Sequence, residues 1–488
     1  MREDLFSYAS KEGVLVAPQA AEFLLGQSDP VRSLKDYFHL LKEKPFLVTL
    51  EDLRERVEIA EGERASNLKN LTPTKLSSTS EPRTPIKSKP HIKPEQLQGI
   101  KVLMDLTGTS NSTGTIDDFD QYFANRFQSL RELVLQTNKV RNPKPVSRLR
   151  QGSVETIAMV RDISTTKKGN RILTMEDESG QVDVLIPDDA DIDAETIVQD
   201  EVLGVIGKMQ GPRRMVIAES LVRPGFTGLR KSWSGTGKVA ITSDVHVGSN
   251  TFLEDKWSSF VEWLGSDEAS DINYLIIAGD LVDGVGVYPG QEEELDIPDV
   301  YDQYLHFAEL LAPIPERIKI LMIPGNHDAV RLAEPQPAFP EKITSMFSSN
   351  VLFLSNPAIV SIDGIEFLIY HGKGLDDLLT TIPGFSYQKP MDGMIAMMER
   401  RHMSPMYGGK TPISPECLDP LVIRTLPDVF ITGHVHLTQV RRMNRILLIN
   451  ASTWQSQTSF QKMKNMVPDP GKAILIDMAT GKEIIKAF

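Results

Sequence analysis

The chain has 488 residues and a formal net charge of −13 at pH 7, and its pI is near 5.3. This length is enough for about two or three domains that each bury a core. The acidic balance argues against a free-standing DNA-binding protein, because such proteins gain much of their affinity from Lys and Arg contacts to phosphate. The single cysteine excludes an intramolecular disulfide framework.

The hydropathy of the chain and its first residues predict where in the cell the protein is located. No apolar run reaches the roughly 18 residues that a membrane-spanning helix needs. The opening Met1-Arg2-Glu3-Asp4 does not resemble a signal peptide. We therefore expect a soluble, intracellular protein of the cytoplasm that has no membrane partner.

The N-terminal region divides into two parts. Residues 1–60 carry spaced apolar side chains such as Leu24, Leu34 and Phe38, which predict a small helical unit. Residues 61–97 are rich in Ser, Thr, Pro and Lys and hold few large apolar side chains. That composition cannot bury a core, so it predicts a flexible linker.

Residues 148–228 predict a small β-barrel. Short alternating or apolar segments are separated by turn signals, and they lie at 154–160, 171–175, 181–186, 202–206 and 214–218. Five such strands are typical of an OB-type barrel, a frequent carrier of single-stranded nucleic acid. A modest basic surface is expected from Lys167, Lys168, Lys208, Arg213 and Arg214. The strands lack aromatic residues for base stacking, so a barrel used only for protein contact is an equally supported alternative.

Five segments within residues 237–488 share one pattern, in which a hydrophobic run ends abruptly in polar residues. The runs predict buried strands, and the Gly, Asp and Asn residues predict the turns that follow them. Open α/β sheets place their sites at the carboxyl ends of neighbouring strands. The segments end in Asp244-Val245-His246, Gly279-Asp280, Gly325-Asn326-His327-Asp328, His371-Gly372 and Gly433-His434-Val435-His436.

These strand ends offer seven candidate metal ligands: Asp244, His246, Asp280, Asn326, His371, His434 and His436. Taken singly, each has a simpler explanation as a turn residue or a hydrogen-bonded core histidine. Carboxylate, imidazole and amide oxygen together suit Mn, Fe or Zn, and the lack of thiolates argues against a structural Cys-type zinc site. Seven groups suit two metals held about 3.5–4 Å apart and bridged by one carboxylate. Asp280 is the natural bridge, because it is the only ligand that its strand offers.

The complete set of motifs resembles the calcineurin-like metallophosphoesterase superfamily, which implies an α/β sandwich over residues 237–488. The resemblance implies two ligand sets that share Asp280: Asp244, His246 and His436 for one metal, and Asn326, His371 and His434 for the other. It gives His327 a catalytic role beside the metals, with Asp328 orienting it. It also favours Mn, with Fe, Zn, Ni and Mg as alternatives.

A second pattern lies between the fourth and fifth motifs, where residues 399–409 are Glu-Arg-Arg-His-Met-Ser-Pro-Met-Tyr-Gly-Gly. It resembles the Arg-His-x-x-Pro-x-Tyr-Gly segment of the small subunits of archaeal family D DNA polymerases. The order of helical unit, linker, OB-type barrel and phosphoesterase domain resembles that family as well. We expect the Met-rich helix at 391–398 to pack in the core and the loop after it to shape the cleft.

The family resemblance implies a proofreading 3′-5′ exonuclease that hydrolyses DNA phosphodiesters beside a large catalytic polymerase subunit, in a heterodimer or a higher assembly. A subunit tethered in this way can borrow DNA affinity from its partner, which answers the objection raised by the net charge. Two alternatives remain: a non-catalytic assembly subunit, and a stand-alone metallophosphodiesterase or nuclease. The complete ligand set favours an enzyme, whereas the barrel and the 399–409 segment disfavour a stand-alone one.

Overall fold

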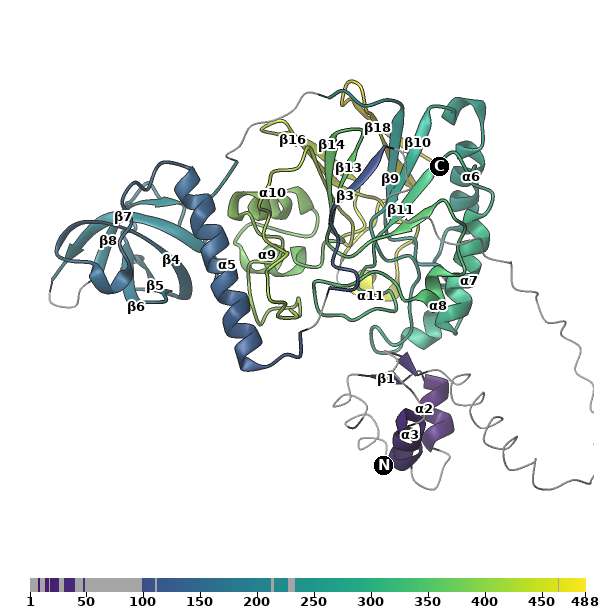
Figure 1. Cartoon of the computed structure of the whole chain (residues 1–488), viewed down its shortest axis with the longest axis horizontal. Coiled ribbons are helices and arrows are strands. Elements are labelled where there is room, and N and C mark those ends of the chain that lie inside the picture. Colours follow the sequence, from purple (N-terminus) through teal and green to yellow (C-terminus); the bar gives the residue numbers. More distant parts are fainter. Residues whose placement is uncertain are drawn as a thin grey trace, which may run out of the picture.

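The computed structural model describes residues 8, 14–16, 18–25, 30–39, 47–48, 99–109, 112–211, 215–226, 233–463 and 465–488 (Figure 1). The linker predicted at 61–97 and much of the helical unit predicted at 1–60 lie outside these ranges. In the described part of the N-terminal unit, Leu24, Leu34 and Phe38 share one small apolar core. The elements there are β1 (Leu15–Val16), α2 (Pro18–Leu25), α3 (Pro30–His39) and β2 (Leu47–Val48).

A closed five-stranded barrel follows, with the strand order β4-β5-β6-β8-β7. Alternate side chains point inward, so that Val182, Val184 and Ile186 of one strand join the barrel core. The barrel closes through a parallel pair between the third and fifth strands, in which Val184 lies opposite Val216. The strands are β4 (Gly152–Thr165), β5 (Arg171–Asp177), β6 (Gly180–Ile186), β7 (Val202–Gln210) and β8 (Met215–Val222).

The basic surface predicted on this barrel is only partly described. Arg213 and Arg214 lie outside the described residues. Lys208 forms an ion pair of 2.8 Å with Glu219 on the neighbouring strand, which offsets its charge. Lys167 and Lys168 are exposed in the turn between β4 and β5, so part of the predicted basic surface is present among the described residues.

The rest of the described chain forms a sandwich of two six-stranded mixed sheets, ordered β12-β11-β10-β9-β18-β19 and β16-β17-β15-β14-β13-β3. The facing sides of the sheets are apolar, and residues such as Ile241, Ile276, Phe367 and Ile431 form a fully buried core between them. The first sheet contains β9 (Lys238–Thr242), β10 (Ile272–Ile277), β11 (Lys319–Met322), β12 (Val351–Phe353), β18 (Lys472–Asp477) and β19 (Glu483–Ala487). The second contains β3 (Ile100–Met104), β13 (Ala358–Ile362), β14 (Ile365–Ile369), β15 (Val429–Thr432), β16 (Gln439–Met443) and β17 (Ile446–Asn450).

Helices cover the outer faces of both sheets (Figure 1). Trp257 of α6 and Phe307 of α7 pack with Leu275 and Ile277 of the first sheet. Methionines of α10 pack with Leu368 of the second sheet, so the predicted Met-rich helix is buried as expected. These helices are α6 (Glu254–Leu264), α7 (Val300–Leu311), α9 (Leu375–Thr381) and α10 (Pro390–Arg400). Shorter ones are η2 (Val146–Arg148), η3 (Asp267–Ala269), η4 (Gln291–Glu294), α8 (Glu341–Thr344) and α11 (Ser459–Met463).

The region between the linker and the barrel corrects the predicted domain limits. Strand β3 pairs with β13 of the second sheet, with Ile100 opposite Ile362. The sandwich therefore extends beyond the predicted 237–488, because a strand from before the barrel completes its edge. Helix α5 (Ile116–Gln136) follows, and its N-terminus is closed by a capping box between Thr115 and Asp118.

Helix α5 lies between the barrel and the sandwich (Figure 1). Its Leu130 and Val134 share a core with Val202 and Val222 of the barrel, whereas its Tyr122 belongs to the core beside the second sheet. The sequence pattern assigns this helix to neither domain.

Within the described ranges, no helix has both the length and the apolar character that crossing a bilayer requires.

Candidate metal centre

All five predicted motifs follow strands, as the pattern required, and they converge at one end of the sandwich. In the first sheet, β9, β10 and β11 are mutually parallel neighbours. In the second sheet, β14 and β15 are parallel. Their carboxyl ends carry the seven predicted ligands: Asp244, His246, Asp280, Asn326, His371, His434 and His436.

The backbone at this edge is strained at non-glycine residues. Asp244, His246, Asp280, His434 and His436 all have φ between 51° and 68°. A non-glycine residue in this left-handed region costs on the order of 1–3 kcal/mol, and such residues cluster at functional sites. Five of the seven candidate ligands share this conformation, which supports a role for the edge beyond packing.

One group of side chains is formed by Asp244, His246 and His436, which each offer a donor atom within 4.8 Å of the other two. The Nε2 atom of His436 lies 3.3 Å from Oδ1 of Asp244 and 3.1 Å from Nε2 of His246. Two imidazole nitrogens that face each other this closely are the arrangement expected of two ligands to one cation.

A second group is formed by Asp280, His371 and His434, again with donor atoms within 4.8 Å. The Nε2 atom of His371 lies 3.2 Å from Oδ2 of Asp280 and 3.1 Å from Oδ1 of Asn326. The amide oxygen of Asn326 therefore faces the same space as the predicted ligands of the second metal.

Asp280 lies between the two groups. Its Oδ2 atom is 3.8 Å from Nε2 of His246 in the first group and 3.2 Å from Nε2 of His371 in the second. Two ions held about 3.5–4 Å apart need such a shared carboxylate. The structure places Asp280 where a bridging ligand would have to be.

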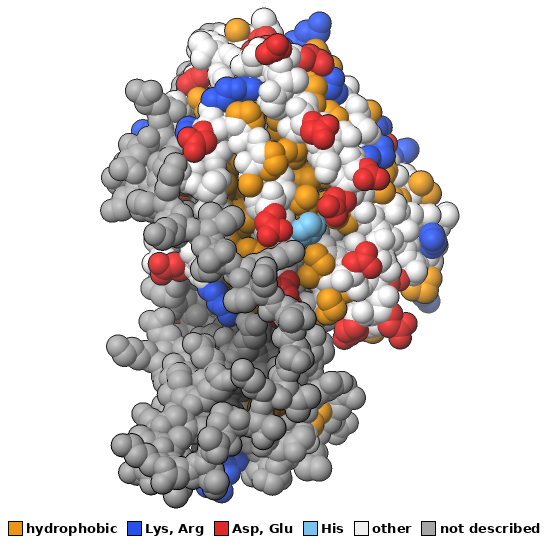
Figure 2. Space-filling model, turned by 90° about the vertical axis from the view of Figure 1, so that its right-hand side faces the viewer, with side chains coloured by type: hydrophobic (Ala, Val, Ile, Leu, Met, Phe, Trp, Pro, Cys, Tyr) orange, Lys and Arg blue, Asp and Glu red, His pale blue; other side chains and the backbone are white. Residues whose placement is uncertain are grey.

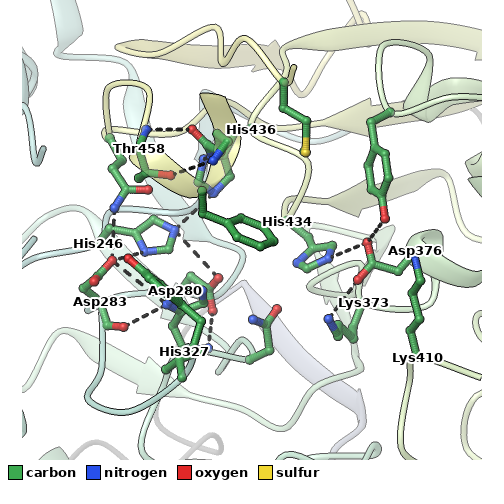
Figure 3. A pocket seen from close by; sticks show the side chains of 18 of the residues that line it. His246, Asp280, Asp283, His327, Lys373, Asp376, Lys410, His434, His436 and Thr458 are labelled. Carbon is green, nitrogen blue, oxygen red and sulfur yellow. Dashed lines mark hydrogen bonds and ion pairs between the residues drawn. The ribbon is translucent and has the colours of Figure 1, made fainter. Parts of the chain in front are cut away.

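The remaining ring nitrogens of the histidines are held by other groups. Nδ1 of His246 lies 3.0 Å from Oδ1 of Asp283 (Figure 3), and Nδ1 of His371 lies 2.9 Å from the carbonyl oxygen of Ala278. Metal-binding histidines almost always donate their other N–H to a carboxylate or a carbonyl in this way. These contacts direct both Nε2 atoms toward the centre.

The other two histidines also have polar partners. Nδ1 of His436 lies 2.8 Å from the side-chain amide of Gln461 in helix α11. Nε2 of His434 lies 3.2 Å from Oδ1 of Asp376 in helix α9. Both partners come from segments that no motif marked, so no signal in the sequence pointed to them.

The role predicted for Asp328 is not what the structure shows. Its carboxylate accepts hydrogen bonds from the backbone N–H groups of Gly325, at 2.8 Å, and Leu281, at 3.2 Å. It also accepts one of 2.8 Å from the hydroxyl of Tyr304. Asp328 thus ties together two of the ligand-bearing loops, because it sits between their backbones.

His327 is oriented by Asp283 instead. Its Nδ1 lies 2.8 Å from the carbonyl oxygen of Asp283 and 4.0 Å from the Oδ1 atom of the same residue. Asp283 is itself buried, and it accepts hydrogen bonds from Gln291 and Gln455 at 2.8 and 3.0 Å. Sequence reasoning missed it, although its position three residues after Asp280 in the same loop was an available signal.

Opposing charges set the protonation of the cluster. Burial raises the pKa of Asp280, but the imidazoles of His371 and His327 outweigh it and hold that pKa well below its ordinary value. Burial alone lowers the pKa of His371, whereas the carboxylate of Asp280 raises it overall to about 10. Burial raises the pKa of Asp328 to about 7, with a further contribution from Asp280. Asp280 and His371 therefore stabilise each other's charged forms.

A cavity of about 630 Å³ opens above this cluster. Figure 3 shows Lys373 and Lys410 on one side of it, His246 and Asp283 on the other, and His434 between them. The wall of the cavity also includes Val287, Tyr288, Asn326, His327, Thr380, Tyr387, Gln455, Thr458, Phe460, Gln461 and Met466. On the described part of the face seen in Figure 2, acidic, basic and hydrophobic side chains are interspersed.

None of residues 399–409 lines this cavity, whereas Lys410, the next residue of the same loop, does. Arg400 lies 3.1 Å from Glu201 of the barrel. His402 lies 2.8 Å from Asp419, which also forms a 2.7 Å ion pair with Arg126 of helix α5. The segment instead joins the sandwich to the barrel and to α5, through charged side chains that are all buried.

The sequence of this chain is similar to those of known DNA polymerase subunits. The family model that describes the B subunits of DNA polymerases alpha and epsilon matches residues 239–441. The DNA polymerase II small subunit of Methanothermobacter thermautotrophicus is 41% identical over 397 residues, which cover 78% of this chain and 82% of that one. The DNA polymerase II small subunit of Archaeoglobus fulgidus is 38% identical over 440 residues, 86% of each chain.

Among solved structures, the one described as that of a novel archaeal phosphodiesterase covers 51% of this chain and 99% of its own, with 15% identity and a TM-score of 0.27. The phosphoesterase Yfce from E. coli covers 51% of this chain and 98% of its own, with 14% identity and a TM-score of 0.27.

Proposed function

The chain belongs to the family of archaeal DNA polymerase II small subunits, and on this basis we propose that it is a metal-dependent 3′-5′ exonuclease. In this role it removes nucleotides from DNA ends beside a large polymerase subunit. A small subunit implies such a larger partner. The observation that carries the proposal is the position of Asp280 between two groups of histidine and carboxylate ligands.

The domain types are part of the proposal. We assign the two-sheet sandwich to the calcineurin-like phosphoesterases, because its strand ends carry that superfamily's motifs in their usual order. We assign the closed barrel of β4 to β8 to the OB type on its five strands and its closure. The proposed domains are the N-terminal unit at 1–60, the linker at 61–97, the barrel at 148–228 and a sandwich that adds β3 to 237–488.

The donor set fits two divalent cations. Asp244, His246 and His436 would hold one and Asn326, His371 and His434 the other, with Asp280 shared. Carboxylate, imidazole and amide donors accept Mn, Fe, Zn, Ni or Mg, and the family resemblance favours Mn. When bound, two such ions supply Lewis acidity and an activated water at neutral pH.

The protein's own residues supply positioning and a proton. Nδ1–H of His327 donates to the carbonyl oxygen of Asp283, so the doubly protonated ring would present Nε2–H to the departing 3′ oxygen of the upstream nucleotide and transfer that proton to it. The backbone N–H of His327 donates to Oδ1 of Asp280 at 2.8 Å, which ties this imidazole to the shared carboxylate. Asp328 stabilises the loops that carry both residues.

The test incubates the purified full-length chain, with and without Mn²⁺, on single-stranded oligonucleotides labelled at the 5′ or the 3′ end. We expect stepwise shortening from the 3′ end, which is lost in Asn326→Ala and His327→Ala. Leu418→Ala, an exposed residue outside the cavity, serves as the control. Equal products from all four proteins would overturn the enzyme and favour an assembly role, whereas loss of label from the 5′ end would overturn the polarity.

A further inference from the structure

We propose that the cavity orients a DNA 3′ end, with the terminal base on Tyr288 and Phe460 and the next upstream phosphate at Lys410. This assignment rests on the proposed function and deepens it by specifying the path of the strand. It follows from the chemistry of two opposite walls of one cavity, which flank the candidate metal centre.

The first wall is aromatic. The rings of Tyr288 and Phe460 are stacked, with centroids 6.0 Å apart and planes inclined by 28°. The ring of Tyr288 lies 6.4 Å from that of His327, and its hydroxyl is anchored to Glu294 at 3.0 Å. Phe460 keeps 44% of its surface exposed although it lines the cavity. The exposed part of Phe460 therefore gives the cavity an aromatic surface beside the candidate metal centre.

The second wall is basic and lies beyond His434 (Figure 3). Lys410 is exposed, and its ammonium group is 6.0 Å from the ring centre of Tyr387. Lys373 lies on the same wall, but Asp376 holds its ammonium group at 2.8 Å and offsets its charge. Lys410 is therefore the stronger candidate for an anion contact on this wall.

A nucleotide strand matches both walls at once. Stacking of one base on an aromatic side chain contributes about 1–3 kcal/mol and tolerates any base. A phosphorylated peptide carries no planar ring at a fixed distance from its phosphoester, so it would leave the aromatic wall unused. A dinucleotide unit offers both a base and a second phosphate.

The direction of the strand follows from the count of phosphates. When a strand is cut one nucleotide from its 3′ end, the departing nucleotide carries only the phosphate that is attacked. Any other phosphate within reach belongs to the upstream strand. The basic wall must therefore face upstream, which leaves the aromatic wall for the departing base.

The test measures binding without turnover. The full-length chain is titrated, with Ca²⁺ in place of Mn²⁺, into oligonucleotides that carry the fluorescent base 2-aminopurine at the terminal or at the fourth position from the 3′ end. Stacking on protein aromatics quenches this fluorophore. We expect quenching of the terminal probe, about tenfold weaker binding by Phe460→Ala, and recovery by Phe460→Trp.

Met463→Ala is the matched control, because Met463 lies on the same helix, is 78% exposed and does not line the cavity. For the other wall, a neutral methylphosphonate replaces the first upstream phosphate. We expect it to weaken binding severalfold in the wild type and to have no further effect in Lys410→Ala.

The outcomes separate this inference from the proposed function. Terminal quenching that Phe460→Ala abolishes, in a chain that never cleaves DNA, would support the base site and contradict the exonuclease. DNA cleavage with terminal quenching unaffected by Phe460→Ala would overturn the base site alone. Quenching of the fourth-position probe instead of the terminal one would overturn the assigned strand path.

Discussion

Two buried clusters of charged residues pack against the sandwich, and they differ in how their side chains are paired. At the junction with the barrel and α5, Asp419 is held by Arg126 and His402, so opposite charges meet at hydrogen-bonding distance. At the strand ends, carboxylates also lie beside histidines, but like groups face each other as well, as do the Nε2 atoms of His246 and His436.

This difference separates a structural cluster from a functional one. Burying a charge is tolerated when an opposite charge and hydrogen bonds satisfy it. The charges at the junction are neutralised by one another, so the junction needs no bound ion. At the strand ends, donor atoms converge on a shared space and the backbone is strained, an arrangement suited to binding a cation.

The strongest effect should come from the shared carboxylate. Asp280→Asn should weaken both metal positions, because Oδ2 of Asp280 faces His246 of one group and His371 of the other, and should lower exonuclease activity by about 10³-fold or more. Metal content and cleavage rate are measured together. Asp271→Asn, which breaks an exposed ion pair with Lys238, should leave both unchanged. A variant at position 280 that retains two metals and full activity would remove the distinction between the clusters.

At the junction, stability should change and metal binding should not. Asp419→Ala leaves Arg126 buried without its partner, which should cost about 3–5 kcal/mol of unfolding free energy. Urea denaturation of the chelated protein measures this. Glu219→Ala at the exposed pair with Lys208 is the control and should cost at most about 1 kcal/mol. An equally small loss for Asp419→Ala would show that the junction charges are not essential.

The junction should also make stability depend on pH. Burial, assisted by Arg126, lowers the pKa of His402 to about 4. When the pH falls below 6.5, the ordinary pKa of histidine, His402 becomes protonated in the unfolded chain but stays neutral in the folded chain. The contribution of His402 to the free energy of unfolding is therefore complete only above pH 6.5. As the pH falls toward 4, about 3 kcal/mol should be lost.

Thermal midpoints of the chelated protein at pH 7 and pH 5 test this expectation, with His402→Gln as the comparison. The variant should lose less of its midpoint over this interval than the wild type does. An identical loss in both proteins would assign the pH dependence to other groups.

A smaller effect is expected from the residues that hold the ligands. Asp283→Ala frees Nδ1 of His246 and should weaken metal affinity by about 10- to 100-fold. Competition with a fluorescent chelator measures this change. Gln291→Ala removes one amide that donates to Asp283 and should lower metal affinity less than Asp283→Ala does, because Gln291 acts on the histidine only through Asp283. A larger effect at Gln291 than at Asp283 would contradict this order.

Local pattern along the chain was enough to name the candidate ligands. A hydrophobic run followed by Gly, Asp or Asn specifies a buried strand and the turn after it, so all seven candidate ligands could be placed at strand ends. The five barrel strands followed from alternation and turn residues in the same way. Such features are readable because both strand and turn depend on a few neighbouring residues.

The meeting of distant side chains, by contrast, became visible only in the folded molecule. Asp283 replaced Asp328 as the partner of His327, and Gln461 contacted His436. Residues of the 399–409 segment contacted the barrel and, through Asp419, helix α5. Strand β3 joined a sheet whose neighbouring strand lies more than two hundred residues later. These contacts depend on how whole layers of the structure pack together. Contacts between residues far apart in the sequence produce no local or periodic sequence pattern that could predict them.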